Sequence, residues 1–222
     1  MIDVLKETSR MEKAFLVGVQ EPGMDSFTAG EHLFELNELV ASLGLSVAGE
    51  LMVTLREPCP RLFIGSGKAG QAVAAAKEKG ADCIVVDHEL TPSQQRNWEK
   101  LSGLPVVDRQ EVIIDIFAKR ASTKEAVIQV ELARLQYLLP RLARAWTHLS
   151  RQKGGAMGTR GEGEQQIEVD RRIIKQKIAH YQRELKELKL HRNVQRKQMT
   201  RTEIPHAAIV GYTNAGKSTL LN

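Results

Sequence analysis

The residues with the clearest chemical potential lie in one short stretch, Gly211 to Thr219, which has the spacing of a phosphate-binding loop. It has the form G-x-x-x-x-G-K-[ST] and follows an apolar run, Ala207 to Val210, that is typical of a β-strand. In such a loop the backbone amides bind phosphate oxygens, the lysine reaches the β- and γ-phosphates, and the next hydroxyl ligates Mg²⁺. Lys217 and Ser218 occupy the last two positions. We predict a nucleoside triphosphate site with Mg²⁺, formed by Gly211, Tyr212, Thr213, Asn214, Ala215, Gly216, Lys217, Ser218 and Thr219.

Phosphoryl transfer needs more than a phosphate loop. It also needs an acidic partner for Mg²⁺, a residue that orders the attacking water, and a segment that recognises the base. None of these can follow Asn222, the last residue of the sequence. We therefore expect the chain to be a piece of a longer protein, with no catalytic residue of its own and no nucleotide turnover when it is purified alone.

Composition predicts an ordinary globular chain of one or two domains, with 222 residues, 42% of them hydrophobic and 27% charged. No apolar run reaches the roughly 18 residues of a membrane span, and the N-terminus has no secretory signal pattern. We expect a cytoplasmic monomer. Cys59 and Cys83 have neither metal-site nor disulfide-framework spacing, so we expect both thiols to be reduced.

The net charge of +5 is unevenly distributed along the chain. Residues 1–140 contain 15 Lys and Arg against 20 Asp and Glu, whereas residues 141–201 contain 16 against 6. A local surplus of positive charge favours a polyanionic partner, RNA or DNA, although solvated helix faces are also often rich in Lys and Arg.

Apolar segments of strand length alternate with helical segments from Lys13 to Arg120. This alternation predicts an N-terminal α/β domain at residues 1–121, with a doubly wound, mostly parallel sheet. The apolar run 62–64 is expected to be one of the strands, and a helix is expected between it and Gly80.

A second glycine-rich motif lies inside this domain. Gly65, Gly67 and Gly70 come between the expected strand and helix, and Asp87 ends the next strand. The pattern nearly matches a dinucleotide-binding fingerprint, so an NAD(P)-binding Rossmann enzyme is one alternative. Contact with an anion through Lys68 and a purely structural turn are the others.

Past Ser122 the apolar spacing changes to alternating steps of four and three residues, which is typical of helices that pack along a seam. The first seam contains Ile128, Leu132, Leu135, Leu139, Leu142, Trp146 and Leu149, and the second contains Ile167, Ile174, Ile178, Tyr181, Leu185 and Leu188. Either helix alone would leave an apolar stripe in water. We therefore predict an antiparallel helical hairpin at residues 122–202, interrupted in its first helix at Pro140, before a truncated P-loop domain begins at 203–222.

The expected tip of the hairpin, residues 152–164, has five glycines between Gly154 and Gly163 and is flanked by arginines. Such a segment has little apolar surface to bury, and its charge suits a narrow anionic cavity. A flexible linker between the two helices is the simpler alternative.

The residues from Gly154 to Arg172 resemble a signature of the HflX family of translation-associated GTPases, G-x-R-G-P-G-E-T-Q-L-E-x-D-R-R. Glu162, Gln165 and Ile167 stand where the family has proline, threonine and leucine, and the other fixed positions match. Together with the G-Y-T-N-A-G-K-S loop after a helical hairpin and an α/β domain, the resemblance covers nearly the whole chain.

The resemblance implies a GTPase that binds the large (50S) ribosomal subunit, inserts the glycine-rich loop near the peptidyl transferase centre, and splits or rescues stalled ribosomes. It implies GTP and Mg²⁺ as ligands, and guanine specificity rests on the resemblance alone. It also implies rRNA contacts by Arg160, Gly161, Gly163, Arg171 and Arg172. A non-enzymatic RNA-binding or coiled-coil module is a further alternative.

Overall fold

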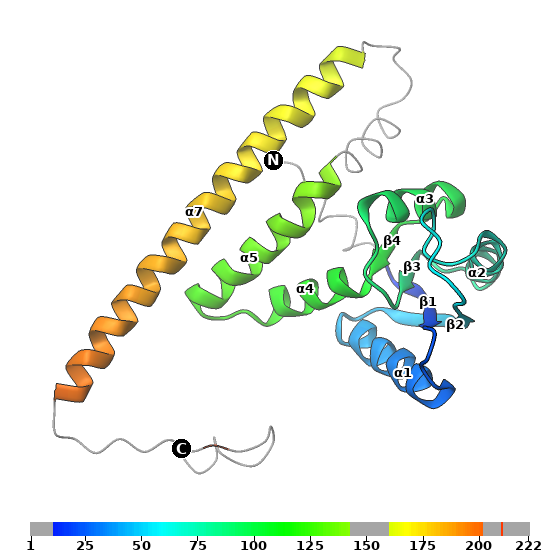
Figure 1. The fold of residues 1–222 in the computed structure, drawn as a ribbon, viewed down its shortest axis with the longest axis horizontal. Helices are drawn as coiled ribbons and strands as arrows, with labels where there is room; N and C mark the ends of the chain where they lie inside the picture. Colours follow the sequence, from blue (N-terminus) through cyan, green and yellow to red (C-terminus); the bar gives the residue numbers. More distant parts are fainter. Residues whose placement is uncertain (1–10, 143–159, 202–209, 211–222) are drawn as a thin grey trace. The chain divides into compact units, whose positions relative to one another are not determined.

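The computed structural model describes residues 11–142, 160–201 and 210, and in the last long helix it describes side chains from Glu168 to Val194. Residues 11–120 alternate strands with helices (Figure 1). In chain order the elements are β1 (Lys13–Gln20), α1 (Ser26–Ser42), β2 (Ser46–Thr54), α2 (Ser66–Glu78), β3 (Cys83–Val86), α3 (Pro92–Ser102), β4 (Val106–Asp108) and α4 (Arg109–Arg120).

These four strands form one parallel sheet in the order β2-β1-β3-β4. Successive side chains on a strand point to opposite faces, so Ala14 and Leu16 reach one face of the sheet while Phe15 and Val17 reach the other. Residues of α1 and α4 pack on the first face, and residues of α2 and α3 pack on the second. The α/β class with a parallel sheet is therefore confirmed, and helices cover both faces.

Local signals explain where these helices begin and end. Asp25 caps α1, because its carboxylate accepts a hydrogen bond from the Thr28 amide at 2.9 Å. Thr91 and Gln94 form a capping box at the start of α3, and Gly103 ends that helix in the left-handed conformation, with φ of +73°.

The prediction of a strand at residues 62–64 is wrong. Phe63 makes only an isolated antiparallel bridge with Cys59, in which the two residues exchange backbone hydrogen bonds of 2.7 and 2.8 Å. Its φ of +67° lies in the left-handed region, which an extended strand does not visit. All three side chains are buried in the core, so their apolar character reflects core packing outside the sheet.

Within the described ranges, the α/β domain is followed by α5 (Lys124–Leu138), the short 3₁₀ helix η3 (Leu139–Arg141) and α7 (Arg160–Arg201). Pro140 lies within η3, so the expected interruption of the first seam helix is confirmed. Ile128 and Leu142 of the first seam and Ile174 of the second are buried. Trp146 and Leu149 lie outside the described residues, and the antiparallel hairpin itself stays a prediction.

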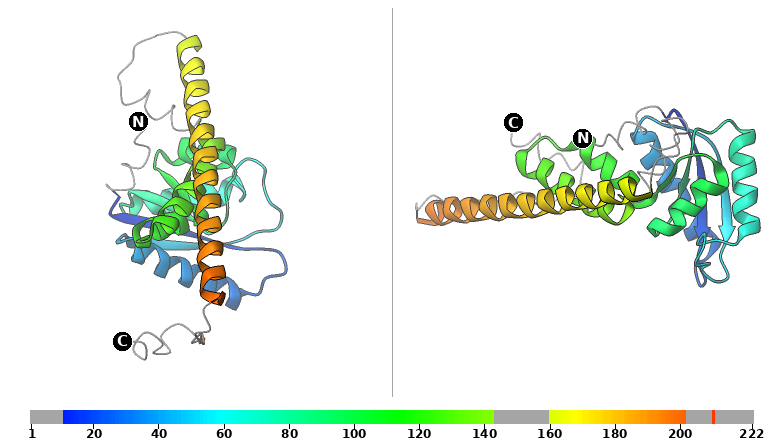
Figure 2. Two further views of the ribbon diagram at one scale, coloured as in Figure 1. Left: turned by 90° about the vertical axis from the view of Figure 1, so that its left-hand side faces the viewer. Right: turned by 90° about the horizontal axis from the view of Figure 1, so that it is seen from above.

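The long helix α7 begins earlier than the sequence suggested (Figure 2). Residues 160–164, the last part of the expected glycine-rich tip, are helical, and residues 152–159 lie outside the described ranges. Each interior glycine costs a helix about 1 kcal/mol relative to alanine. Propagation from the long run of good helix formers after Gly163 offsets that cost, because only nucleation of a helix is strongly unfavourable.

By their contacts, the residues divide into two compact units, 1–182 and 183–222, with the division inside α7. The first unit includes α5 and η3 as well as the sheet, because α5 packs on α4. Among the helices of the described ranges, none combines the length and apolarity that crossing a bilayer requires.

Candidate nucleic-acid interface

The strongest concentration of positive charge in the chain lies on α7. From Arg171 to Arg201 this helix contains eleven Lys and Arg and only two acidic residues, Glu184 and Glu187. Every Lys and Arg whose side chain is described in that stretch is exposed, and these are Arg171, Arg172, Lys175, Lys177, Arg183, Lys186, Lys189 and Arg192. Exposed cations on a helix can contact phosphates of a folded nucleic acid.

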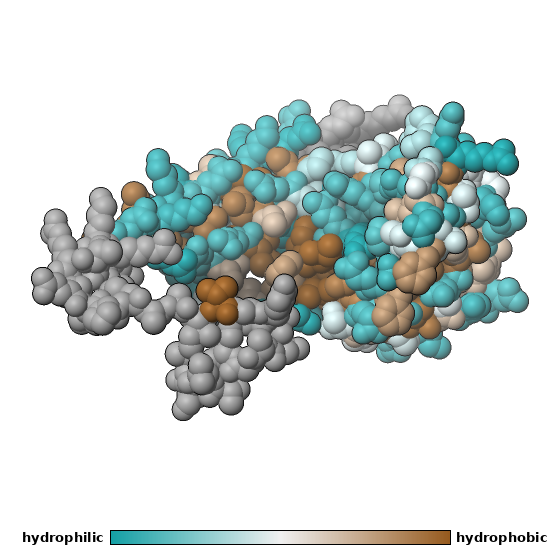
Figure 3. Space-filling view, turned by 60° about the horizontal axis from the view of Figure 1, so that its bottom comes forward, coloured by the Kyte–Doolittle hydropathy of each residue, from teal (hydrophilic) through white to brown (hydrophobic). Residues whose placement is uncertain are grey.

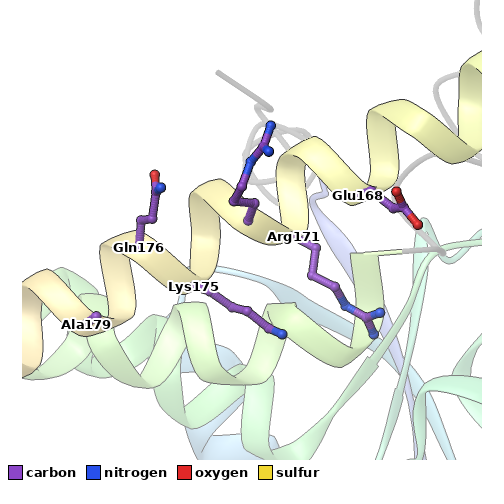
Figure 4. Close-up of a pocket in the computed structure, with 6 residues that line it drawn as sticks. Glu168, Arg171, Lys175, Gln176 and Ala179 are labelled. Carbon is purple, nitrogen blue, oxygen red and sulfur yellow. The ribbon is translucent and has the colours of Figure 1, made fainter.

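One part of this surface is hollowed (Figure 4). An open depression of about 490 Å³ is lined by Glu168, Arg171, Arg172, Lys175, Gln176 and Ala179. Glu168, Arg172, Lys175 and Ala179 follow one another in steps of four, three and four residues, so they share a face of the helix, and Arg171 and Gln176 lie beside them in the sequence. The side chains of Arg171 and Lys175 project to the same side of α7, while Gln176 projects away from them (Figure 4). Three cations around one open hollow, with Glu168 the only acidic residue in its lining, favour binding of a phosphate group.

The helical periodicity of α7 explains why these cations face outward. Ile174 is buried, and Ile178 and Tyr181 are half-buried, so the apolar seam takes one side of the helix. Arg171, Lys175 and Lys177 fall between the seam residues and are exposed. The cations therefore lie along the borders of the seam and around the rest of the helix, where water reaches them.

A buried polar network joins the C-terminal end of α5 and the short helix η3 to the α/β domain. We call it the Arg141 network, formed by Gln95, Asp108, Glu111, Tyr137 and Arg141. The Arg141 side chain is only 6% exposed. Its Nε donates to Gln95 Oε1 at 3.0 Å, and its Nη2 donates to the Leu90 carbonyl at 2.6 Å and to Asp108 Oδ2 at 3.2 Å.

The other members of the Arg141 network close it around the guanidinium group. Asp108 is fully buried, and its Oδ1 accepts from the Glu111 amide at 2.9 Å, which caps α4. Glu111 Oε2 accepts from the Tyr137 hydroxyl at 2.8 Å and from Gln95 Nε2 at 3.1 Å. The Arg141 guanidinium carbon also lies 3.6 Å from the centroid of the Tyr137 ring. The network thus connects α3, β4 and α4 with α5 and η3.

Burial raises the pKa of Tyr137, and the negative charges of Glu111 and Asp108 raise it further. The phenol therefore keeps its proton and remains a hydrogen-bond donor to Glu111. Sequence reasoning did not find this network. The available signals were the capping pattern from Asp108 to Glu111 and a single arginine directly after Pro140 in an apolar seam.

The second glycine-rich motif does not have the geometry of a dinucleotide site. Gly67 and Gly70 lie inside α2, and a Cβ atom added to Gly65, Gly67 or Gly70 would meet no atom within 4 Å. No close packing therefore requires these glycines, whereas the fingerprint uses its third glycine for helix–strand packing.

The acid of that motif is also engaged elsewhere. The side chain of Asp87 is 4% exposed, and its Oδ1 accepts from Arg109 Nη1 at 2.7 Å, so its carboxylate is already engaged in an ion pair. Arg109 in turn pairs with Glu35 of α1. The NAD(P) alternative is therefore not supported by the structure.

The remaining predicted site residues fall outside what the structure describes. The phosphate loop, Gly211 to Thr219 with the Mg²⁺ ligand Ser218, is in the undescribed part, as is the tip before Arg160. Arg160, Gly161 and Gly163 are placed only as backbone in the first turns of α7. Within the described ranges, no group of three or more His, Cys, Asp or Glu residues has an arrangement that could hold a metal ion.

Two protein-family models match this chain, and together they cover most of it. The N-terminal region of GTP-binding GTPases matches residues 30–118, and the middle region of GTP-binding GTPases matches residues 120–199. The chain is 48% identical over 232 residues to a GTPase HflX of Akkermansia muciniphila, covering 100% of this chain and 52% of the relative. It is 45% identical over 192 residues to the GTPase HflX of Escherichia coli, covering 86% of this chain and 45% of that protein.

A solved structure gives the same result for the fold. A GTP-binding protein of Sulfolobus solfataricus, crystallised in complex with GDP, matches with a TM-score of 0.53 and 25% identity, over 96% of this chain and 52% of that one. The α/β domain and the helices after it thus define the N-terminal and middle regions of a GTP-binding GTPase. The chain belongs to the HflX family, as the resemblance in its sequence indicated. It spans about half the length of the relatives that it matches.

Proposed function

We propose that the intact protein binds and hydrolyses GTP and associates with the large (50S) ribosomal subunit, splitting or rescuing stalled ribosomes in the cytoplasm. The observation that carries the proposal is the exposed cationic face of α7, in a chain that belongs to the HflX family of GTPases and also contains a phosphate-loop sequence. An RNA-rich particle is a polyanion, and a protein gains affinity for it by releasing counterions from phosphates.

In this proposal the phosphate loop holds the nucleotide. Lys217 contacts the β- and γ-phosphates, and the Ser218 hydroxyl is a hard oxygen donor of the kind that Mg²⁺ prefers. When bound, Mg²⁺ neutralises charge on the phosphates. Hydrolysis requires further residues that we assign to the remainder of the intact protein, so this chain alone is expected to show no GTP turnover.

Arg171, Arg172 and Lys175 supply the contacts with rRNA phosphates, since they surround the open hollow on α7. Arg160, Gly161 and Gly163 belong to the same proposed contact region at the start of the helix. The Arg141 network supports this contact region by holding η3 against the α/β domain.

Cosedimentation of the intact protein with purified large subunits tests the RNA contact. The double variant Arg171→Glu and Arg172→Glu is expected to weaken binding and to flatten its dependence on salt, because each lost phosphate contact lowers the slope by about one. The matched control is Lys77→Glu with Lys100→Glu, which makes the same charge change at exposed positions of α2 and α3. Equal binding by both double variants would contradict the proposal.

A further inference from the structure

The helix α1 has an unusual outer face. Its inner residues Leu33, Leu36 and Val40 pack in the core, as expected for an amphipathic helix. On the opposite side, however, Phe27 is 73% exposed and Phe34 is 69% exposed. Figure 3 shows apolar side chains at the surface among hydrophilic ones in this part of the domain. Two large aromatic side chains exposed on one helix are candidates for a contact surface, because exposed apolar groups that gather on one surface often mark interaction sites.

The spacing places the two rings on one stripe of α1. Phe27, Glu31, Phe34 and Glu38 follow one another in steps of four, three and four residues, and all four are exposed. The two phenylalanines are seven residues apart, which corresponds to about 10 Å along the helix axis. We call this stripe, with Gly30, the α1 face.

Gly30 leaves a notch between the rings. A Cβ atom at this position would meet no atom within 4 Å, so nothing inside the protein needs a glycine there. Glycine in the middle of a helix costs about 1 kcal/mol relative to alanine. Because packing does not require this glycine, the open space above it, between two exposed rings, can accept a side chain of a binding partner.

The charge of the α1 face restricts what can occupy it. The helix contains Glu31, Glu35 and Glu38 and no Lys or Arg. Glu35 is paired with Arg109, whereas no ion pair of Glu31 or Glu38 occurs among the described residues. The surface therefore combines two aromatic rings with two unneutralised carboxylates. Like-charge repulsion disfavours nucleic acid, an anionic membrane surface and a second copy of the same face.

From these observations we propose that the α1 face docks a protein segment that carries Lys or Arg beside an apolar side chain. The apolar side chain enters the notch at Gly30 between Phe27 and Phe34, and the cations pair with Glu31 and Glu38. Aromatic anchors with a charged rim are the usual composition of such contacts. None of the residues of the α1 face belongs to the phosphate-loop sequence or to α7.

A synthetic amphipathic peptide tests the proposal, with leucine along one helical face and lysine along the other. Its binding to the full chain is measured by fluorescence anisotropy, beside a peptide with glutamate in place of lysine and an RNA oligonucleotide. The lysine peptide is expected to bind, and Phe34→Ala is expected to weaken it about tenfold or more. Leu101→Ala, a truncation at a 44% exposed residue of α3, is the matched control and is expected to leave binding unchanged.

Two further variants separate binding from folding. Gly30→Leu fills the notch, so it is expected to weaken the lysine peptide while maintaining or raising the thermal midpoint, since leucine is the better helix former. Glu31→Lys with Glu38→Lys is expected to abolish the preference for the lysine peptide over the glutamate peptide. The proposal is overturned if Phe34→Ala and Leu101→Ala bind alike, if the glutamate peptide binds as well as the lysine peptide, or if RNA displaces the peptide from α1.

Discussion

Replacing Arg141 by methionine tests the Arg141 network most directly. The substitution keeps a long apolar side chain but removes the hydrogen bonds to Gln95, Leu90 and Asp108. Asp108 is completely buried, so it would lose the cation that balances its charge, although the amides of Leu90 and Glu111 would still reach it. Breaking a buried ion pair by removing one partner typically costs about 3–5 kcal/mol.

We therefore expect Arg141→Met to lower the free energy of unfolding by about 3–5 kcal/mol, a large share of the roughly 5–15 kcal/mol that stabilises a typical domain. Arg141→Lys is expected to fall between methionine and wild type, because it keeps the charge and loses the planar, multiply bonded geometry. The double variant Arg141→Met with Asp108→Asn is expected to be less destabilised than the sum of the single changes, since the neutral amide needs no counter-charge.

Urea denaturation followed by far-ultraviolet circular dichroism measures these differences. Arg120→Met removes an exposed arginine at the end of α4 and is the matched control, expected to change the free energy by about 0.5 kcal/mol or less. Hydrogen exchange gives a second readout, because weaker anchoring should increase exchange of the α5 amides. If Arg141→Met and Arg120→Met unfold at the same urea concentration, the network does not anchor η3 and the reasoning fails.

Two further predictions concern buried titratable groups. Burial raises the pKa of the Cys83 thiol to about 12. At pH 8 a thiol reagent should therefore label the half-buried Cys59 first and label Cys83 only after denaturant is added. Equal labelling rates of the two thiols in the native protein would contradict this prediction. Burial also raises the pKa of Asp115, and the attraction of Arg134 offsets this only in part, so the folded state holds the Asp115 proton more tightly than the unfolded chain does. The resulting stabilisation is present below the unfolded pKa of 3.8 and is lost as the pH rises through the pKa of Asp115 in the folded state. Urea midpoints measured between these two pKa values should therefore depend less on pH in Asp115→Asn than in wild type.

Several features of the fold could be predicted from the sequence because they depend on neighbouring residues. The alternation of strands and helices between Lys13 and Arg120 and the break at Pro140 follow from local periodicity or backbone chemistry. The same reasoning failed at residues 62–64. An apolar run of that length is equally compatible with a strand and with a loop that covers the core, and only the packing around Phe63 distinguishes them.

The α/β class, the apolar seam and positive charge of α7, and the motifs that indicated the HflX family could be recognised in the sequence, because each is a matter of residue type and spacing. Which distant residues meet depends instead on how the elements pack together. Arg141 and Gln95 are 46 positions apart, and Arg109 and Glu35 are 74 apart, so no local pattern pairs them. Folding also engaged Asp87 with Arg109 and left Phe27 and Phe34 in water, because burial depends on how the helices cover the sheet.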